Sequence, residues 1–435
     1  MADISPFAGL RYATERVGDL ATVLCPPYDV IGEDERRELE ARHPDNVVRL
    51  ELPRGADDAR YTTAARLLGS WTAEGILRPD AREAFYLYEQ QFGYGGQRYT
   101  RRGFFAAVRL EPFERRVVLP HEKTLSAPKE DRRRLLQATR TQISPVFGLY
   151  RDAAGAARAI IDEAAEAAAA VDATTADGVR HRLWPMTSAV ALDGLRVLLA
   201  DRQILIADGH HRYETMLGLA PELRPLDVAA GAAASDYAMM FLARAEDPGL
   251  LVLPTHRLVK DLTDFSFDGL LAAAAPAFDI TQGDETTAEA IEARLTSDGA
   301  SRVVFAVRAP GRKQTFWFAL KPILDLSALG PPALRNLDVT VLHGVILGPL
   351  LRIDAEALAK QSFLTYTHDT AEALGRVERG DVQAAFFMNP TKVEQVLAAC
   401  EAGFVLPQKS TYFLPKLATG LVMYRLDGAA PRPRR

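Results

Sequence analysis

The stretch that decides the local fold is Ile204-Leu205-Ile206-Ala207-Asp208-Gly209-His210-His211-Arg212-Tyr213-Glu214. Its short apolar run stops at Asp208-Gly209, which predicts a buried strand followed by a tight turn. The residues from His210 onward follow a helical pattern. A strand that passes through a glycine turn into a helix is typical of α/β layers, so we expect a mixed α/β fold.

The same turn contains the residue types of an anion-binding site. Gly209 allows a close approach of the backbone to a ligand, and Arg212 offers a planar fork that matches two phosphate oxygens. The N–H groups of the first helical turn add to the attraction. Asp208, His210 and His211 complete a polar cluster at a strand end, where open α/β sheets present ligands. The alternative is that Asp208 only caps the helix and that the histidines are ordinary surface or core residues.

Composition bounds the class of protein. A chain of 435 residues suggests two or three domains, and 48% hydrophobic with 25% charged residues is a globular balance. The net charge of -5 creates no field that attracts nucleic acid or an anionic membrane, so neither partner is expected. Two distant cysteines, Cys25 and Cys400, indicate no disulfide framework and fit a reducing cytoplasm. No stretch approaches the roughly 18 apolar residues that span a bilayer.

Local patterns predict further elements. Two β-rich runs around Gly93-Tyr94-Gly95-Gly96 predict an antiparallel hairpin over residues 85–110. The alanine-rich stretch 153–171 predicts a helix, because alanine loses no rotamer freedom there. A second hairpin is expected over residues 303–319, and alternating helices and strands between residues 362 and 426.

Four other segments have residues suited to chemistry. His121-Glu122-Lys123-Thr124 places a possible acid/base, a carboxylate and a cation side by side. Pro254-Thr255-His256-Arg257 brings histidine and arginine to an expected strand end. The third segment, Pro407 to Lys416 with Lys409, Ser410 and Thr411, combines lysines and hydroxyls suited to a phosphate or carboxylate. In the fourth, a diproline turn fixes the direction of Tyr28 and Asp29, although Asp29 could be only a turn residue. For the first two the alternative is a solvated or structural loop. The fourth segment is Cys25 to Val30.

The sequence disfavours several common sites. The histidines of the close pair are adjacent rather than four apart, so a zinc enzyme is not expected. The chain has neither a G-x-x-x-x-G-K-[ST] phosphate loop nor a G-x-S-x-G nucleophile elbow, and no G-x-G-x-x-G lies between a strand and a helix.

Five motifs in order resemble the bacterial and archaeal family called domain of unknown function 1015. The Asp208-Gly209-His210-His211-Arg212 turn is similar to the phosphate-binding loop of the ParB/sulfiredoxin-like fold, particularly its free-serine kinase branch. The resemblance implies a ParB/sulfiredoxin-like core over residues 1–256 and an additional C-terminal α/β region over residues 257–435, whose Lys409 loop would close over the site. The five motifs are Pro26 to Ile31, His121 to Thr124, Ala207 to Thr215, Pro254 to Arg257 and Lys409 to Phe413.

Members of that fold bind cytidine triphosphate as clamps, reduce sulfinic cysteine or phosphorylate serine. The turn has no cysteine, which disfavours reductase chemistry, and the net charge does not suggest a DNA-binding clamp. The resemblance therefore implies a nucleotide-dependent kinase of serine or a related amino or hydroxy acid, with ATP or ADP and Mg²⁺. The second hypothesis is a non-catalytic nucleotide or phosphometabolite sensor.

The kinase hypothesis assigns roles to individual residues. Asp29 is the first candidate for the general base, Glu122 the second, and His211 a further catalytic candidate. The partners would be a nucleotide and a small-molecule acceptor. The residues expected to contact the nucleotide are Asp208, Gly209, His210, His211, Arg212, His121, Lys123, Thr124, His256, Arg257, Lys409, Ser410 and Thr411.

Overall fold

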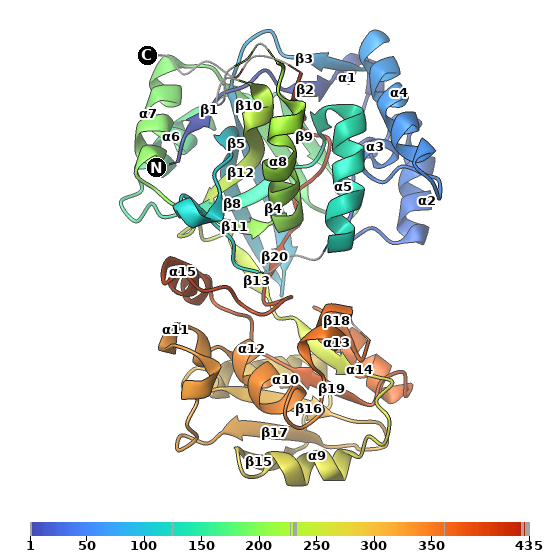
Figure 1. The fold of residues 1–435 in the computed structure, drawn as a ribbon, viewed down its shortest axis with the longest axis vertical. Coiled ribbons are helices and arrows are strands. Elements are labelled where there is room, and N and C mark those ends of the chain that lie inside the picture. The colour runs from blue at the N-terminus through green and yellow to red at the C-terminus, as the bar shows by residue number, and fades with distance from the viewer. Residues whose placement is uncertain are drawn as a thin grey trace. The chain divides into compact units, whose positions relative to one another are not determined.

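The N-terminal part of the chain forms one mixed sheet. The computed structural model describes residues 2–122, 126–226, 228, 233–360, 362–427 and 430. Within these residues the sheet has nine strands in the order β6-β11-β8-β12-β5-β4-β10-β9, with β1 paired to β5 (Figure 1). The strands are β1 (Ile4–Ser5), β4 (Phe85–Tyr94), β5 (Gln97–Arg109), β6 (Val118–Leu119), β8 (Val146–Tyr150), β9 (Val171–Thr174), β10 (Arg180–Met186), β11 (Ile204–Asp208) and β12 (Tyr237–Arg244).

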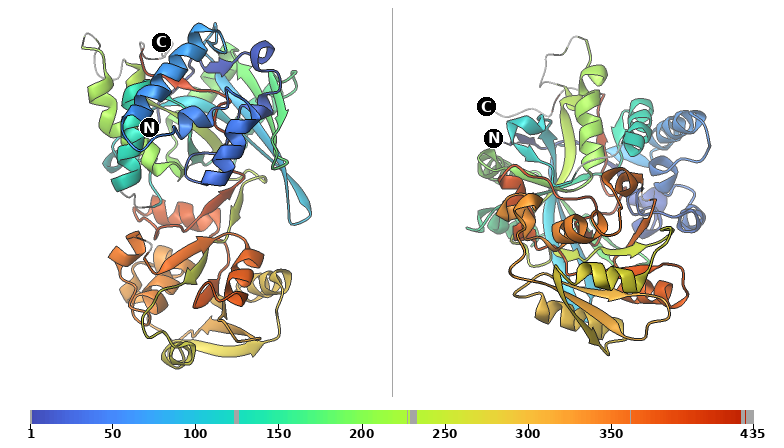
Figure 2. Two further views of the ribbon diagram at one scale, coloured as in Figure 1. Left: turned by 90° about the vertical axis from the view of Figure 1, so that its right-hand side faces the viewer. Right: turned by 60° about the horizontal axis from the view of Figure 1, so that its bottom comes forward.

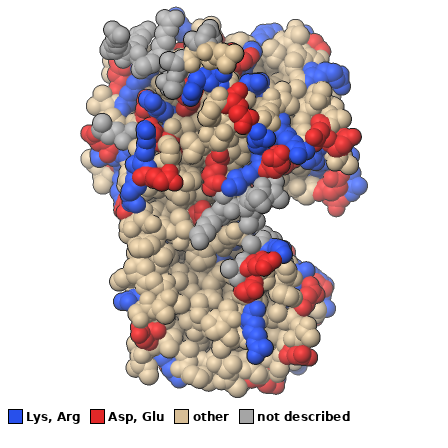
Figure 3. Space-filling view, viewed as in Figure 1, with Lys and Arg blue, Asp and Glu red and all other residues tan. Residues whose placement is uncertain are grey.

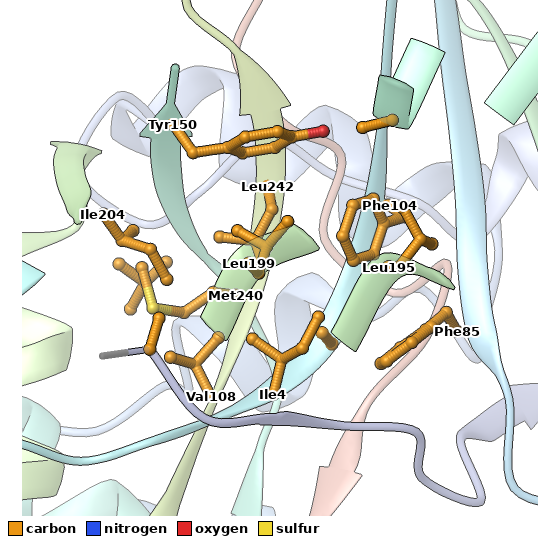
Figure 4. Close-up of a cluster of buried hydrophobic side chains, with 14 of the residues drawn as sticks. Ile4, Phe85, Phe104, Val108, Tyr150, Leu195, Leu199, Ile204, Met240 and Leu242 are labelled. Carbon is orange, nitrogen blue, oxygen red and sulfur yellow. The ribbon is translucent and has the colours of Figure 1, made fainter. Parts of the chain in front are cut away.

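Helices α6 and α7 cover one face of this sheet. Side chains alternate across a strand, so every second residue of β4, β5 and β12 points to that face. Figure 4 shows the resulting core, in which Leu195 and Leu199 of α7 lie among residues of the sheet. The helices around the sheet are α1 (Thr14–Val17), α2 (Glu33–Arg42), α3 (Val48–Glu51), α4 (Ala59–Ala73), α5 (Ser126–Thr139), α6 (Ala156–Ala164), α7 (Ala189–Ala200) and α8 (His210–Leu223).

A second sheet lies in the later part of the chain. Its six strands, counted within the described residues, are all antiparallel in the order β15-β17-β16-β19-β14-β18. Helices α10 and α14 pack on one face through Ile291, Leu295, Leu374 and Val377. The strands are β14 (His256–Val259), β15 (Phe278–Gly283), β16 (Val304–Arg308), β17 (Thr315–Leu320), β18 (Leu364–Thr367) and β19 (Ala384–Phe387), and the helices are α9 (Phe267–Ala274), α10 (Ala288–Asp298), α11 (Pro332–Arg335), α12 (Asp338–Val341), a π-helix (Leu342–Leu347), α13 (Ala355–Lys360), α14 (Thr370–Glu378) and α15 (Val393–Glu401).

The chain forms two compact units around these sheets. Unit 1 comprises Met1–Pro120, Thr124–Leu251 and Pro415–Arg435, and unit 2 comprises His121–Lys123 and Val252–Leu414. After the chain returns to unit 1, β21 (Tyr424–Arg425) pairs with β7 (Thr141–Gln142). The remaining short strands are β2 (Leu10–Tyr12), β3 (Leu77–Pro79), β13 (Leu251–Leu253) and β20 (Tyr412–Leu414). The predicted boundary after residue 256, as a boundary between independent domains, stays a prediction.

The mixed α/β fold is confirmed, and most of the predicted elements are present. The hairpin over residues 85–110 is β4 and β5, which join at Tyr94 and Gln97; its light-blue ribbon extends beyond the rest of the unit 1 sheet in Figure 2. The hairpin over 303–319 is β16 and β17, and the strand at 204–207 is β11, followed by α8.

The predicted helix over residues 153–171 is wrong in its extent. Helix α6 ends at Ala164, and Val171 begins strand β9, which pairs with β10 at the edge of the sheet. Alternate residues of β9, Val171 and Ala173, are buried. Residues 165–170 form a turn and an irregular segment, in which Trp184 Nε1 donates to the Ala167 carbonyl at 2.8 Å and the Ala170 N–H donates to the Leu183 carbonyl at 2.8 Å. These contacts and the strand pairing of Val171 outweigh the helix propensity of the alanines, which is a weak local preference.

The surface charge and the length of the helices concern two partners that the sequence does not favour, nucleic acid and the membrane. On the face of unit 1 shown in Figure 3, acidic and basic side chains are interspersed. In the described part of the chain, no helix is both long and apolar enough to cross a membrane.

Candidate functional site

The turn between β11 and α8 has a geometry that only glycine adopts easily. Gly209 lies in the left-handed region with φ 88°. A Cβ at this position would lie 2.9 Å from Arg212 Nε, so glycine also allows the guanidinium to fold back over the turn. Gly209 is the N-cap residue of α8 and has no side chain that could cap the helix. Instead of capping the helix, Asp208 accepts a hydrogen bond from the Gly209 N–H at 2.8 Å.

Asp208 is held between two cations. Lys416 Nζ donates to Asp208 Oδ2 at 3.0 Å, and Arg212 Nη2 lies 3.8 Å from the same oxygen. Burial by itself raises the pKa of Asp208, but Lys416 and Arg212 outweigh it and hold the pKa well below its usual range. The carboxylate therefore stays ionised at neutral pH. The two cationic side chains are mostly buried, with 15% of Lys416 and 11% of Arg212 exposed.

Arg212 is also close to the N-terminal diproline turn. Its guanidinium donates to the carbonyl oxygen of Pro145. Burial lowers the pKa of Arg212, but Asp208 and Asp29 raise it, so the pKa is raised overall. Asp29 is exposed and lies within electrostatic range of Arg212. Burial raises the pKa of the neighbouring Tyr28 to about 12, against the opposing charge of Arg212.

Lys416 reaches Asp208 because the β4–β5 hairpin fixes the main chain around it. Arg101 Nη2 donates to the carbonyl oxygen of Pro415 at 2.6 Å, and Gln90 Nε2 donates to that of Lys416 at 3.0 Å. Arg101 is fully buried and stacks on Phe147 with 4.9 Å to the ring centroid. This burial lowers the pKa of Arg101 to about 10, so it remains charged at pH 7. Arg101 and Gln90 are therefore positioning residues for Lys416.

Beside Arg212 lies a cavity of about 50 Å³. It is bounded by α5, α8, the end of α3 and the segment before β8. Glu51 is 1% exposed and Arg132 6% exposed, so both charged groups are deeply buried. The Arg132 guanidinium lies 4.0 Å from the centroid of the Tyr28 ring. The lining residues are Glu51, Arg132, Leu135, Leu136, Thr141, Gln142, Ile143, Ser144, Arg212, Thr215 and Met216.

The two histidines of the turn differ in exposure. His210 is 8% exposed and contributes to the low pKa of Asp208. His211 is partly exposed. The structure thus brings Asp208, Gly209, His210 and Arg212 together with Lys416. The catalytic role of His211 stays a prediction.

The predicted residues of unit 2 form a separate hydrogen-bonded group. His256 and Arg257 lie on β14, which is paired on both sides. His256 Nδ1 accepts from the Met388 N–H at 3.2 Å, and its Nε2 lies 3.0 Å from Thr370 Oγ1. Burial, with Arg257 nearby, lowers the pKa of His256 to about 3, so the ring is neutral at pH 7.

Arg257 is 1% exposed, and its guanidinium group donates hydrogen bonds to main-chain carbonyl oxygens. Its Nη1 donates to the carbonyl oxygen of Thr255, and its Nη2 donates to the carbonyl oxygen of Lys409 at 2.9 Å. Lys409 has a positive φ of 58°. Burial lowers the pKa of Arg257 to about 10. These contacts give Arg257 a structural role in unit 2, and its predicted contact with a nucleotide stays a prediction.

The segment around His121 joins the same group. His121 Nε2 lies 2.8 Å from Thr411 Oγ1, and Glu122 Oε1 accepts from the Ser410 N–H at 3.0 Å. The two motifs, which are far apart in sequence, are therefore adjacent in space. Lys123 and Thr124 lie outside the described residues. The hypothesis that the Lys409 loop closes over the Arg212 turn stays a prediction.

Comparison with known proteins assigns the family. A family model described as "Protein of unknown function (DUF1015)" matches residues 4–340. The chain belongs to this family. The resemblance drawn from the motifs is therefore confirmed at the family level. The match includes the Arg212 turn and ends within unit 2, so Lys409, Ser410 and Thr411 lie beyond it.

Solved structures are similar to this DUF1015 chain at low identity. A conserved hypothetical protein from Pyrococcus furiosus is 14% identical, with a TM-score of 0.36, over 73% of this chain and 95% of that chain. A free serine kinase in complex with AMP is 13% identical, with a TM-score of 0.37, over 73% and 92%. SbnI with a C-terminal truncation, from Staphylococcus aureus, is 10% identical, with a TM-score of 0.34, over 74% and 87%. No curated protein matches the chain.

Sequence reasoning missed several residues of the site in this DUF1015 protein. Glu51, Arg132 and Ser144 line the cavity, and Arg101 positions Lys416. A charged residue inside the apolar stretch Val47 to Pro53 was the available signal for Glu51. Arg132 lies among other charged residues of α5, and nothing in its local pattern distinguishes it from them.

Proposed function

We propose that this protein is a nucleotide-dependent kinase that phosphorylates the hydroxyl of a small molecule, serine or a related amino or hydroxy acid. The observation that carries the proposal is the start of α8 after the left-handed Gly209, flanked by the mostly buried cations Arg212 and Lys416. Helix N-termini and arginine forks are the protein groups best suited to phosphate oxygens. The resemblance of this turn to the free-serine kinase loop supports the same function and a ParB/sulfiredoxin-like type for the core.

The charges around the turn suit phosphoryl transfer, which depends mainly on positioning and electrostatics. Arg212 and Lys416 would neutralise the phosphate, and Asp29 would accept the proton of the acceptor hydroxyl. The hydroxyl oxygen would form a bond to the terminal phosphorus as the bond from phosphorus to the nucleotide breaks. ADP would leave if ATP is the donor, and AMP if ADP is the donor.

A magnesium ion would arrive with the nucleotide. The described residues contain no group of three or more histidine, cysteine or carboxylate side chains placed to hold a metal. Magnesium at nucleotide sites usually keeps several waters and binds substrate phosphates with one or two carboxylates. The ion would therefore be held mainly by the phosphate oxygens and by water.

Turnover with defined donors and acceptors tests the proposal. The full chain is incubated with ATP or ADP, Mg²⁺ and L-serine or small hydroxy acids, and ³¹P NMR follows nucleotide loss and the phosphorylated product. We expect a phosphate ester to form with one donor. Asp29→Asn should lower kcat about a hundredfold, a usual contribution of a general base, while nucleotide affinity is kept.

The sensor hypothesis gives a different result in the same experiment. A sensor is stabilised by the nucleotide but consumes none with any acceptor. A protein that binds neither ATP nor ADP contradicts both hypotheses.

A further inference from the structure

The cavity beside Arg212 contains a buried carboxylate that is only partly used by the protein. Glu51 Oε1 accepts from Ser144 Oγ at 2.8 Å and from the Tyr28 N–H at 3.4 Å. Among the described residues, none donates a hydrogen bond to the other oxygen, Oε2. A buried carboxylate can accept several hydrogen bonds, and an unused oxygen is unfavourable unless a donor reaches it.

The neighbouring Arg132 does not donate a hydrogen bond to Glu51 Oε2. Arg132 Nη1 donates to the main-chain oxygen of Glu51 at 2.8 Å but lies 3.8 Å from the nearer carboxylate oxygen. Its Nε donates to Asp131 Oδ2 at 2.9 Å, and its Nη2 donates to the same oxygen. The charge of Arg132 is thus shared between Asp131 and Glu51, and its donors point mainly to groups other than the Glu51 carboxylate.

The other groups of the lining differ in character. Arg132 and Arg212 supply guanidinium groups, so a bound ammonium group would depend on Glu51 for its counter-charge. Thr141 and Thr215 supply hydroxyls, and Leu135, Ile143 and Met216 supply apolar walls. The volume of about 50 Å³ exceeds the roughly 10–15 Å³ needed for one water molecule, so the cavity has room for a small polar group. An ammonium N–H donating to a carboxylate is among the stronger hydrogen bonds in proteins.

We propose that this cavity binds the ammonium group of the acceptor, and that Glu51 selects amino acids and amino alcohols over hydroxy acids. Arg212 both lines the cavity and belongs to the turn proposed to bind phosphate, so a bound amine lies next to that turn. The inference deepens the proposed function by naming the substrate class. Amine binding itself can be measured without turnover.

The wild-type protein provides the first test. Calorimetric titration of the full chain uses L-serine, ethanolamine and glycerate, in which a hydroxyl stands where serine has its ammonium group. We expect L-serine and ethanolamine to bind, and glycerate to bind at least tenfold more weakly than L-serine. Equal binding of glycerate and L-serine, or no binding of either amine, overturns the proposal.

The variant Glu51→Gln provides the second test, because it removes the charge and nearly keeps the shape. Its Kd for L-serine should rise tenfold to a hundredfold, while its Kd for ADP stays within about twofold. The control is Glu222→Gln on the exposed side of α8, where Glu222 pairs with Arg133 and does not line the cavity. That variant should bind L-serine like the wild type.

The outcomes separate this inference from the kinase proposal. If Glu51→Gln binds L-serine as tightly as the wild type, Glu51 is structural and the inference is overturned. If the Glu51→Gln variant does not fold, the titrations of the wild-type protein with L-serine, ethanolamine and glycerate still test the inference. Amine binding without nucleotide consumption contradicts the kinase and supports the amine site. Equal kcat/KM with serine and glycerate supports the kinase and overturns the amine site.

Discussion

Arg212 and Arg257 are both buried arginines next to a histidine-containing motif, yet their surroundings differ. Arg212 follows a strand end and a glycine turn, lies near the carboxylates Asp208 and Asp29, and lines a cavity. Arg257 lies within a strand paired on both sides and donates to main-chain carbonyls. Burial strengthens the electrostatic effect of each contact, and the environment of Arg212 includes a cavity. The same residue type therefore serves a candidate site in unit 1 and the integrity of unit 2.

The largest expected effect is that of Arg257→Lys on stability. Lysine cannot reach the carbonyls of Thr255 and Lys409 together, so buried acceptors lose their donors. We expect unit 2 to lose about 2–4 kcal/mol of stability. Hydrogen exchange over residues 254–259 and 406–411 measures the loss locally. Unchanged exchange together with weaker nucleotide binding would remove the contrast between the two arginines.

Arg212→Lys should act on affinity instead. Lysine keeps the charge but loses the planar fork, so nucleotide affinity should fall by about 1.5–3 kcal/mol, roughly tenfold to a hundredfold in Kd. Calorimetric titration with ATP and ADP measures it, and Arg257→Lys, corrected for the folded fraction, is the matched control. An unchanged Kd in Arg212→Lys with loss of folded protein would make Arg212 a structural residue like Arg257.

Acid should weaken unit 2 through His256. Its pKa is about 3 in the fold and about 6.5 when unfolded, so protonation favours the unfolded state. The contribution is complete above pH 6.5 and is lost as pH falls toward 3, by about 2 kcal/mol between pH 7 and pH 5. Hydrogen exchange of residues 256–259 against pH should show this slope, and His256→Gln should reduce it. Parallel slopes for both proteins would exclude His256 as its source.

Gly209→Ala should have the smallest effect, about 1 kcal/mol of stability from the left-handed backbone, with weaker nucleotide binding because Cβ would displace Arg212. Gly155→Ala is the matched control. Gly155 also precedes a helix with a positive φ of 72°, but a Cβ there meets nothing within 4 Å. Thermal unfolding should shift similarly in both variants, and nucleotide titration should change only in Gly209→Ala. Equal affinities would show that the position of Arg212 over the turn is unimportant for binding.

Local patterns predicted the parts of the fold that depend on neighbours in sequence. The apolar run before Asp208, the glycine at 209 and the helical pattern after it identified β11, the turn and α8, because each signal lies within a few residues. The alanine-rich stretch at 153–171 shows the limit of this reasoning. The helix ends at Ala164, and only the last residue of the stretch, Val171, enters strand β9, whose partner strand β10 is not visible in local composition.

The sequence by itself determined the family, the mixed α/β class and the turn from Asp208 to Arg212. Only the tertiary structure decided that Lys416 binds Asp208 across 208 positions of the chain, and that Glu51 lies in a cavity beside Arg212. It also decided that Arg257 donates to the main-chain carbonyls of Thr255 and Lys409. Periodicity reports which face of an element is buried, whereas the partners of a buried charge depend on how distant elements pack.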